Sequence, residues 1–279
     1  MSAFLSALFG HPWPLIGVVH LPALPGSPTH RLPMQELEAH VLADARALIE
    51  AGFDGIVVEN FGDHPFYPDN VEPHTVAAMT LLATRIADLT RTLVPERPPV
   101  LGINVLRNDA RAALAIAAST GARFIRVNVH TGAMVTDQGL IQGRAHETLR
   151  YRKMLGTNTV ILADVLVKHA HPLGTADLEG TARDTVLRGG ADAVIISGRG
   201  TGEPTDLARA RRLREVLPTT AVIIGSGLTL EALDDAIRAT DGAIVGTALK
   251  HGGDVSAPID RARAAAFIHD RDRLRARRP

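Results

Sequence analysis

Short runs of valine, isoleucine and leucine recur along the whole chain, and almost none of them alternates apolar with polar residues. The runs occupy residues 15–20, 55–60, 100–105, 123–128, 159–164, 193–197, 221–225 and 243–247. Continuous apolar segments of this length are typical of strands that are buried on both faces of a parallel sheet. They begin on average about 33 residues apart, which is the size of one strand–helix repeat.

Amphipathic, alanine-rich segments separate these runs and predict helices at 34–51, 75–93, 109–120, 145–155, 175–188, 206–216, 230–239 and 258–268. Asp109, Asp206 and Thr229 stand where helix N-caps belong, and Gly52 and Gly242 stand where a helix gives way to the next strand. Eight such units without a break in composition predict one α/β domain over residues 1–279, a closed (β/α)₈ TIM barrel. An open, doubly wound sheet is the alternative.

Three long connections interrupt the regular pattern, at 21–33, 61–73 and 135–144, after the first, second and fourth predicted strands. In a barrel these loops lie at the same end, where binding sites are built. Residues 1–14 form an N-terminal extension whose Phe4, Leu5, Leu8 and Phe9 are apolar enough to pack on the barrel. Residues 258–279 form the last helix and an arginine-rich tail, which we expect to be solvated.

Charge and composition exclude several classes of protein. The chain has 30 Lys and Arg against 30 Asp and Glu, and this zero net charge argues against nucleic acid as a partner. The chain has no cysteine, which excludes disulfides and thiolate metal sites. No apolar run approaches the roughly 20 residues of a membrane-spanning helix, and no signal peptide is evident, so we expect a cytoplasmic protein.

Every predicted strand ends in a polar or glycine-rich group, and in a (β/α)₈ barrel those ends form the mouth where active sites lie. The pattern therefore predicts a ligand site there. The predicted ligand-binding residues are His20, Asn60, Asn104, Asn128, His130 and Ser197, with Arg199 and Thr201 from the glycine-rich loop after the sixth strand.

Glu59, Asp164 and Lys168 are the predicted catalytic residues. Glu59 and Asp164 are the carboxylates at strand ends, and two carboxyl groups with different pKa values can divide the work of acid and base. Lys168 is one of three lysines in the chain, and a buried lysine can bind an anion or act as acid, base or Schiff-base amine. The alternative is that one carboxylate only pairs with Arg107, Arg126 or Lys168, and that Lys168 is an ordinary loop residue.

Glycines directly after the last two strands predict a phosphate site. The segments "IIGSGLTLEAL" and "AIVGTALKHGG" place them where barrels often hold phosphate on backbone N–H groups. The predicted phosphate-binding residues are Gly225, Ser226, Gly227, Gly246 and Thr247. The alternative is that these glycines serve only tight turns.

Metal and nucleotide cofactors receive weaker support. His169 and His171 suggest a metal pair, but the HxH of metal-dependent barrels usually follows the first strand, so we assign no metal ligands. Mg²⁺ on Glu59 and Asp164 stays open as a cofactor. Neither a G-x-x-x-x-G-K-[ST] loop nor a strand-led G-x-G-x-x-G appears.

The chain resembles the BtpA family, which is named for a protein needed to accumulate photosystem I and includes proteins of sugar-utilisation clusters. The segments "IGVVHLPALPGSP", "AGFDGIVVENFGDHPF", "GINVLRNDARAALAIA", "FIRVNVHTGAMVTDQGLIQG" and "ADVLVKHAHPL" carry the resemblance, with "DAVIISGRGTG", "IIGSGLT" and "GAIVGTALKHGG". They span residues 16–253. The resemblance implies a barrel of the phosphate-binding kind and places the family's motif residues on the strand ends named above.

Two hypotheses of function follow. In the first, the protein is an enzyme that performs acid–base chemistry on a small phosphorylated, sugar-like or nucleoside-like substrate, as an isomerase, a lyase or an enzyme of glycosidic-bond cleavage. In the second, it is a non-catalytic biogenesis or stability factor of the photosystem I type, or a ligand sensor. A homo-oligomer is compatible with both. The polar mouth favours the enzyme, because a surface factor would not need it.

Overall fold

The structure, a computed structural model, describes residues 3–198 and 206–276, and its centre is a closed barrel of eight parallel strands. Around the barrel the order is β1 (Leu15–His20), β2 (Gly55–Glu59), β3 (Val100–Asn104), β4 (Phe124–Val127), β7 (Val160–Asp164), β9 (Ala193–Ile196), β10 (Ala221–Ile224) and β11 (Gly242–Val245). Each strand begins within one residue of its predicted start. Because β11 pairs with β1, the barrel is confirmed and the open sheet is wrong.

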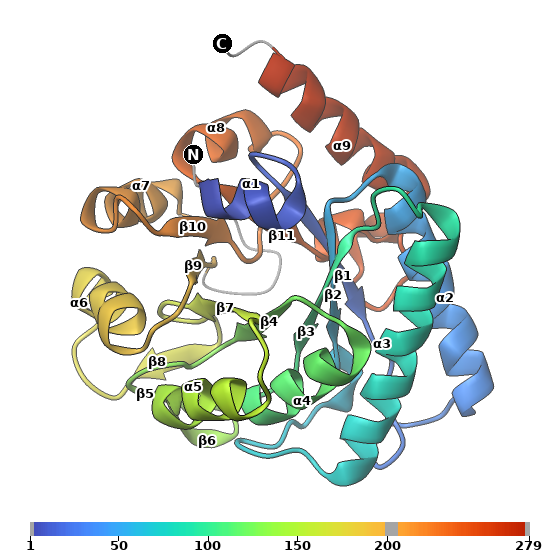
Figure 1. Cartoon of the computed structure of the whole chain (residues 1–279), viewed down its shortest axis with the longest axis horizontal. Coiled ribbons are helices and arrows are strands. Elements are labelled where there is room, and N and C mark those ends of the chain that lie inside the picture. The colour runs from blue at the N-terminus through green and yellow to red at the C-terminus, as the bar shows by residue number, and fades with distance from the viewer. Residues whose placement is uncertain (1–2, 199–205, 277–279) are drawn as a thin grey trace.

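Helices surround the barrel (Figure 1). They are α2 (Met34–Ala51), α3 (Pro73–Leu93), α4 (Ala110–Thr120), α5 (Ala145–Met154), α6 (Leu178–Arg183) with its π-helical continuation η2 (Asp184–Arg188), α7 (Leu207–Val216), α8 (Leu233–Ala239) and α9 (Arg261–Ala276). Asp109 caps α4, since its Oδ1 accepts from the N–H of Ala112 at 2.8 Å, and Asp206 caps α7 in the same way. The predicted cap at Thr229 is wrong, because α8 begins only at Leu233.

Side chains of the barrel strands alternate between the interior of the barrel and the layer of helices outside it, as the period of a strand requires. Ile16, Val18 and Val57 point into the barrel together with Phe124, Ile195 and Ile223. Their neighbours in the sequence pack outward against the helices. Gly102 leaves room for the Phe124 ring, because a Cβ there would lie 2.1 Å from Phe124 Cζ. The interior is therefore a packed core below the mouth.

The N-terminal extension packs on the barrel as expected. It forms α1 (Ala3–Phe9), which crosses one end of the barrel in Figure 1. Leu5, Leu8 and Phe9 join the interior core, and the Phe9 ring lies edge-on to Phe124 with centroids 5.6 Å apart. Phe4 is the exception, since it is 37% exposed. This helix covers the end of the barrel opposite the mouth.

The arginine-rich tail differs from its prediction. Helix α9 extends to Ala276, well beyond the predicted end at residue 268. Arg271 within it is buried and pairs with Asp54 and Asp272, so this part of the helix is held on the barrel and is not simply solvated. A second buried pair, Lys250 with Asp44 at 2.6 Å, joins the loop after β11 to α2.

A small antiparallel sheet stands beside the barrel and was not predicted. It is formed by β5 (Ala133–Thr136) and β6 (Gly139–Gln142), both from the long connection after β4, and by β8 (Ala170–Pro172) from the connection after β7. Its strands have only three or four residues each. The sheet ties two loops of the mouth together.

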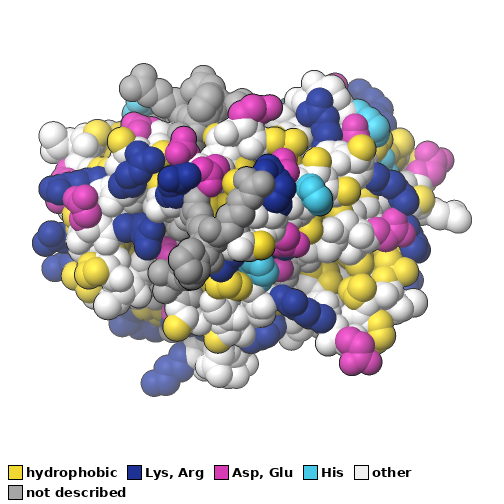
Figure 2. Space-filling view, turned by 90° about the horizontal axis from the view of Figure 1, so that it is seen from above, with side chains coloured by type: hydrophobic (Ala, Val, Ile, Leu, Met, Phe, Trp, Pro, Cys, Tyr) yellow, Lys and Arg dark blue, Asp and Glu magenta, His cyan; other side chains and the backbone are white. Residues whose placement is uncertain are grey.

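The surface mixes both signs of charge. In Figure 2, basic and acidic side chains are interspersed on the face shown, in keeping with the zero net charge. Within the part of the chain that the structure describes, no helix is both long and apolar enough to cross a membrane.

Candidate active site

The C-terminal ends of the strands surround two adjoining cavities. The first has a volume of about 590 Å³ and reaches from His20 to the glycine-rich ends of β10 and β11. The second has a volume of about 370 Å³ and lies toward β3 and β4. Glu59, Phe61, Arg126 and Lys168 line both cavities. These four residues therefore form the boundary between the cavities, and a ligand that occupies both cavities would contact them.

Glu59 is a buried carboxylate at the end of β2. Its Oε2 accepts from Asn104 Nδ2 at 2.5 Å, and its Oε1 lies 3.8 Å from His20 Nε2. Burial alone would raise the pKa of Glu59, but nearby His20, Arg126 and Lys168 and the Asn104 hydrogen bond outweigh it and lower the pKa. Glu59 is therefore an ionised group in the mouth, as a general base must be.

His20 lies beside Glu59 but is neutral near pH 7, and it takes up a proton only in the acid range where Glu59 also titrates. Burial lowers the pKa of His20 to about 4, and Lys250 and Lys168 add to this against the pull of Glu59. Its ring also contacts Phe61, with centroids 4.8 Å apart. A neutral imidazole can exchange a hydrogen bond with Glu59 or a ligand without adding charge.

The buried, neutral state of His20 should make stability depend on pH. The unfolded chain binds a proton on His20 near pH 6.5, where the folded protein does not, so acidification favours unfolding. We expect the free energy of unfolding to fall by about 2 kcal/mol between roughly pH 7.5 and pH 5 for this reason. Urea unfolding of the wild type and of His20→Gln at both pH values measures it, because glutamine does not titrate. Equal pH dependence in the two proteins would contradict the assignment.

Lys168 follows β7 and faces the same region. Burial and the charge of Arg126 lower the pKa of its ammonium group, against the opposing effect of Glu59 and Asp164. A lysine with a lowered pKa can give up or take a proton more readily than an exposed one. The structure thus brings Lys168 and Glu59 to the same cavities, as expected from their strand ends.

Asp164 is held differently from Glu59. Its carboxylate accepts from Nε and Nη2 of Arg126, each at 2.9 Å, and also from Asn128 Nδ2 at 3.2 Å and Ser197 Oγ at 3.3 Å. Of the two carboxylates, Asp164 is thus the one that pairs with an arginine. Asn128 and Ser197 hold it in place, and of these two residues Asn128 also lines the second cavity.

The far end of the first cavity is lined by backbone and small side chains. The predicted phosphate residues Gly225, Ser226, Gly227, Gly246 and Thr247 all lie here, together with Ala248 and Arg263. A Cβ on Gly246 would lie 2.8 Å from His20 Cε1, and one on Gly225 would lie 2.3 Å from Ile195 Cγ2. A side chain at either position would therefore displace His20 or Ile195, so close packing requires glycine at both.

Several predicted ligand residues support loops behind the cavities. Asn60 exchanges hydrogen bonds with the backbone of Leu106, at 2.7 Å to its N–H and 3.3 Å to its carbonyl. His130 Nε2 bonds the carbonyl of Gly189 at 2.8 Å. Asn104 contributes to the mouth only through the hydrogen bond that it donates to Glu59. Predicted Arg199 and Thr201 lie outside the described residues.

Metal-binding side chains do not gather in the described part of the chain. Among residues 3–198 and 206–276, no three or more His, Asp or Glu side chains are placed to hold a metal ion. Both oxygens of Asp164 already accept hydrogen bonds from Arg126, so Mg²⁺ shared with Glu59 would have to displace them. His171 lies in β8 of the small sheet, and His169, just before this strand, lines the second cavity.

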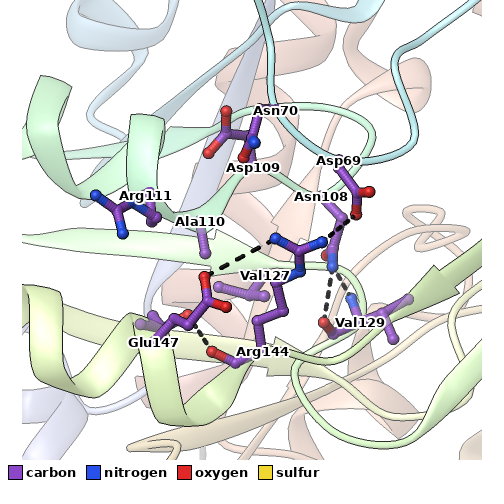
Figure 3. A pocket seen from close by; sticks show the side chains of 11 residues that line it. Asp69, Asn70, Asn108, Asp109, Ala110, Arg111, Val127, Val129, Arg144 and Glu147 are labelled. Atoms are coloured by element: carbon purple, nitrogen blue, oxygen red, sulfur yellow. Dashed lines mark hydrogen bonds and ion pairs between the residues drawn. The ribbon is translucent and has the colours of Figure 1, made fainter.

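A further hollow lies outside the barrel, between the loop before α3 and the start of α5 (Figure 3). Arg144 lies between Asp69, at 3.3 Å, and Glu147, at 3.9 Å. Asn108 exchanges two hydrogen bonds with the backbone of Val129, at 2.8 and 2.9 Å. These ion pairs and hydrogen bonds tie the loops around the hollow to one another.

Sequence reasoning missed Phe61 and Phe66 as site residues, and it considered Arg126 only as a possible partner of a carboxylate, which it is for Asp164. Arg126 carried a signal, because it is a charged residue inside an otherwise apolar strand segment, "FIRVNV". Phe61 and Phe66 come from the long loop after β2, which carries no periodic pattern. Only the fold shows that this loop turns back over the mouth.

Solved structures of low sequence identity share the architecture of this chain. One named native KDPGal matches with a TM-score of 0.55 at 18% identity, over 95% of this chain and 98% of that one. Thiamine phosphate pyrophosphorylase from Pyrococcus furiosus matches with a TM-score of 0.57 at 14% identity, over 94% and 97%. At such low identity these likenesses show the fold alone.

Sequence relatives are much closer. A Synechocystis protein named Photosystem I biogenesis protein BtpA is 48% identical over 255 residues, which is 91% of this chain and 86% of the relative. An uncharacterized protein of Thermococcus kodakarensis is 44% identical, over 94% and 96%. An uncharacterized mitochondrial protein of Caenorhabditis elegans is 34% identical, over 95% of each. A profile described as the BtpA family matches residues 12–273, and the chain therefore belongs to the BtpA family.

Proposed function

We propose that the protein is an enzyme that transfers protons on a small phosphorylated, sugar-like or nucleoside-like substrate bound in the mouth of the barrel. The observation that carries the proposal is Glu59, a buried carboxylate whose pKa is lowered and which lies where the two cavities meet. Keeping a charge buried is costly, and perturbed groups of this kind cluster at functional sites. Isomerisation, aldol-type cleavage and glycosidic-bond cleavage all use such a group.

The surrounding side chains suggest a division of roles. Glu59 acts as the general base, and Lys168 returns the proton or stabilises negative charge that develops on a substrate oxygen. Arg126 adds a fixed positive charge to the same boundary. Asp164 acts through Arg126, whose guanidinium it orients with two hydrogen bonds.

The phosphate end of the substrate would lie in the first cavity. The glycines after β10 and β11 let an anion approach the backbone closely, and Arg263 lines the same space. Thr247 offers a hydroxyl group at this end. Glu231 also lines the cavity and limits how much negative charge it accepts.

Ala248→Asp tests the phosphate end. We expect it to weaken binding of ribose 5-phosphate and glucose 6-phosphate at least about tenfold, because a carboxylate near the bound phosphate repels it. Ala248→Asn adds a side chain of the same size without charge and should keep most of the affinity. Gly246→Asp is less suitable, since its Cβ would also displace His20.

Isothermal titration with these sugar phosphates and with the unphosphorylated sugars measures the effect. The phosphorylated sugars should bind the wild type and the unphosphorylated ones should bind more weakly. If neither phosphorylated sugar nor inorganic phosphate binds at millimolar concentration, the phosphate assignment fails.

A non-catalytic role is the second candidate, favoured by the name of the Synechocystis relative, a photosystem I biogenesis protein. A biogenesis factor or ligand sensor would bind its ligand and release it unchanged. Proton NMR of sugar phosphates incubated with the protein in D₂O separates the two roles. Chemical conversion or deuterium incorporation supports the enzyme, whereas saturable binding without either supports the sensor.

A further inference from the structure

Arg107 is a buried arginine that lines the second cavity without a carboxylate partner. The residue is 6% exposed, and its Nη2 donates to the backbone carbonyl of Lys168 at 2.8 Å. Within residues 3–198 and 206–276, no carboxylate lies within ion-pairing distance of its guanidinium. A guanidinium carries five N–H donors, so most of its donors are left for another acceptor.

The other buried arginines of the described chain are paired. Arg126 forms two hydrogen bonds with Asp164, and Arg271 pairs with Asp54 and Asp272. Leaving a buried cation without its counter-charge is destabilising, and proteins generally avoid it outside functional sites. Arg107 therefore differs from both in a way that packing does not explain.

The backbone around Arg107 is fixed by its neighbours, which Figure 3 shows from the outer side of the barrel. Asn108 forms two hydrogen bonds with Val129, and Asp109 both caps α4 and accepts from the N–H of Val71 at 2.9 Å. The N–H of Arg107 itself donates to the carbonyl of Tyr67 at 3.1 Å. Arg107 is thus presented to the cavity by a rigid loop, which reduces the cost of ordering it on binding.

The remaining lining of the second cavity suits a small organic anion. Phe61, Phe66 and Leu106 form its apolar wall, and Glu59 and Lys168 stand at its boundary with the first cavity. Asp137 also lines it, beyond ion-pairing distance of Arg107. Burial lowers the pKa of Arg107, while Asp164, Asp137 and Glu59 partly offset this.

We propose that Arg107 is a specificity residue that binds a carboxylate of the substrate, which makes the substrate a small phosphorylated carboxylic acid lying across Glu59. This rests on the proposed function for the phosphate end, in the first cavity. The planar guanidinium matches a carboxylate with two parallel hydrogen bonds, which a point charge such as lysine cannot form. The reacting carbons would then lie between the two anionic ends, beside Glu59 and Lys168.

The test compares two ligands that differ only at one end, 6-phosphogluconate and glucitol 6-phosphate, which carry a carboxylate and a hydroxymethyl group respectively. The shorter pair of 3-phosphoglycerate and glycerol 3-phosphate covers a smaller substrate. By isothermal titration, the wild type should bind the acid of at least one pair about tenfold to a hundredfold more tightly than its neutral-ended partner.

Variants assign this preference to Arg107. Arg107→Gln should bind both members of the pair equally, with the affinity of the neutral-ended ligand unchanged, and Arg107→Lys should keep only part of the preference. Arg111→Gln is the matched control, because Arg111 stacks over Tyr151 outside the barrel, 4.6 Å from the ring centroid, and should behave like the wild type. Circular dichroism and melting temperature confirm that each variant is folded.

Two results would overturn the proposal. One is a wild type that does not distinguish acid from neutral partner in either pair, and the other is a preference that survives in folded Arg107→Gln. Gluconate and glucitol, which lack phosphate, separate the two proposals. A preference for gluconate that Arg107→Gln removes supports the carboxylate site even if phosphate itself contributes nothing.

Discussion

Glu59→Gln should slow turnover by a factor of about 10² to 10⁴ while the barrel stays folded. Glutamine keeps the shape of the side chain and an oxygen that can accept from Asn104, but it cannot take a proton from the substrate. Because Glu59 pairs with no arginine in the described structure and its Oε1 is 3.8 Å from a neutral His20, loss of its charge breaks no strong ion pair.

The measurement follows conversion or deuterium incorporation by NMR, with whichever phosphorylated compound the wild type converts. Glu59→Asp keeps a carboxylate base but places it farther from the substrate, because the side chain is shorter, and should retain part of the rate. The activity of the wild type should fall in acid as Glu59, whose pKa lies below its ordinary value of 4.5, takes up a proton. Unchanged turnover in Glu59→Gln would remove Glu59 as the base and leave only a binding site.

Whereas Glu59→Gln should leave the barrel folded, Asp164→Asn should destabilise it and lower the free energy of unfolding by about 3 to 5 kcal/mol. The asparagine amide cannot accept both donors of Arg126, so a buried guanidinium loses its counter-charge. Urea unfolding measures the loss. Ser197→Ala removes only the 3.3 Å hydrogen bond to Asp164 and should cost about 1 kcal/mol.

A double variant identifies the cause of this loss. In Arg126→Met/Asp164→Leu neither charge remains, so stability should recover part of what Asp164→Asn loses, because apolar side chains can replace a buried ion pair. An Asp164→Asn protein as stable as the wild type would show that Arg126 does not depend on this carboxylate. Asp164 would then be like Glu59, a strand-end carboxylate that the protein does not need as the partner of an arginine.

Most of the barrel could be predicted because its repeat is regular. Strands buried on both faces are nearly continuous apolar runs, and the helices between them carry local caps such as Asp109. The prediction failed where local signals are weak. The start of α8 follows a loop that lines the first cavity, and the strands of the small sheet are too short to show a period.

The site could be located from the sequence but not assembled. The two cavities lie at the strand ends that the sequence indicated, and Glu59, Lys168 and the glycines after β10 and β11 line them. Asn60 and His130 instead hold loops. In a strand with apolar residues on both faces, the pattern does not show which alternate set points inward.

The sequence by itself determined the eight repeats and the end of the barrel where polar groups collect. Only the tertiary structure decided which of these groups are paired. Arg126 and Asp164 lie 38 positions apart and meet because β4 and β7 are neighbours in the barrel, so that Asp164 is neutralised while Arg107 is not. The physical reason is that burial makes a charge depend on its nearest partners, and the closure of the barrel chooses those partners from distant parts of the chain.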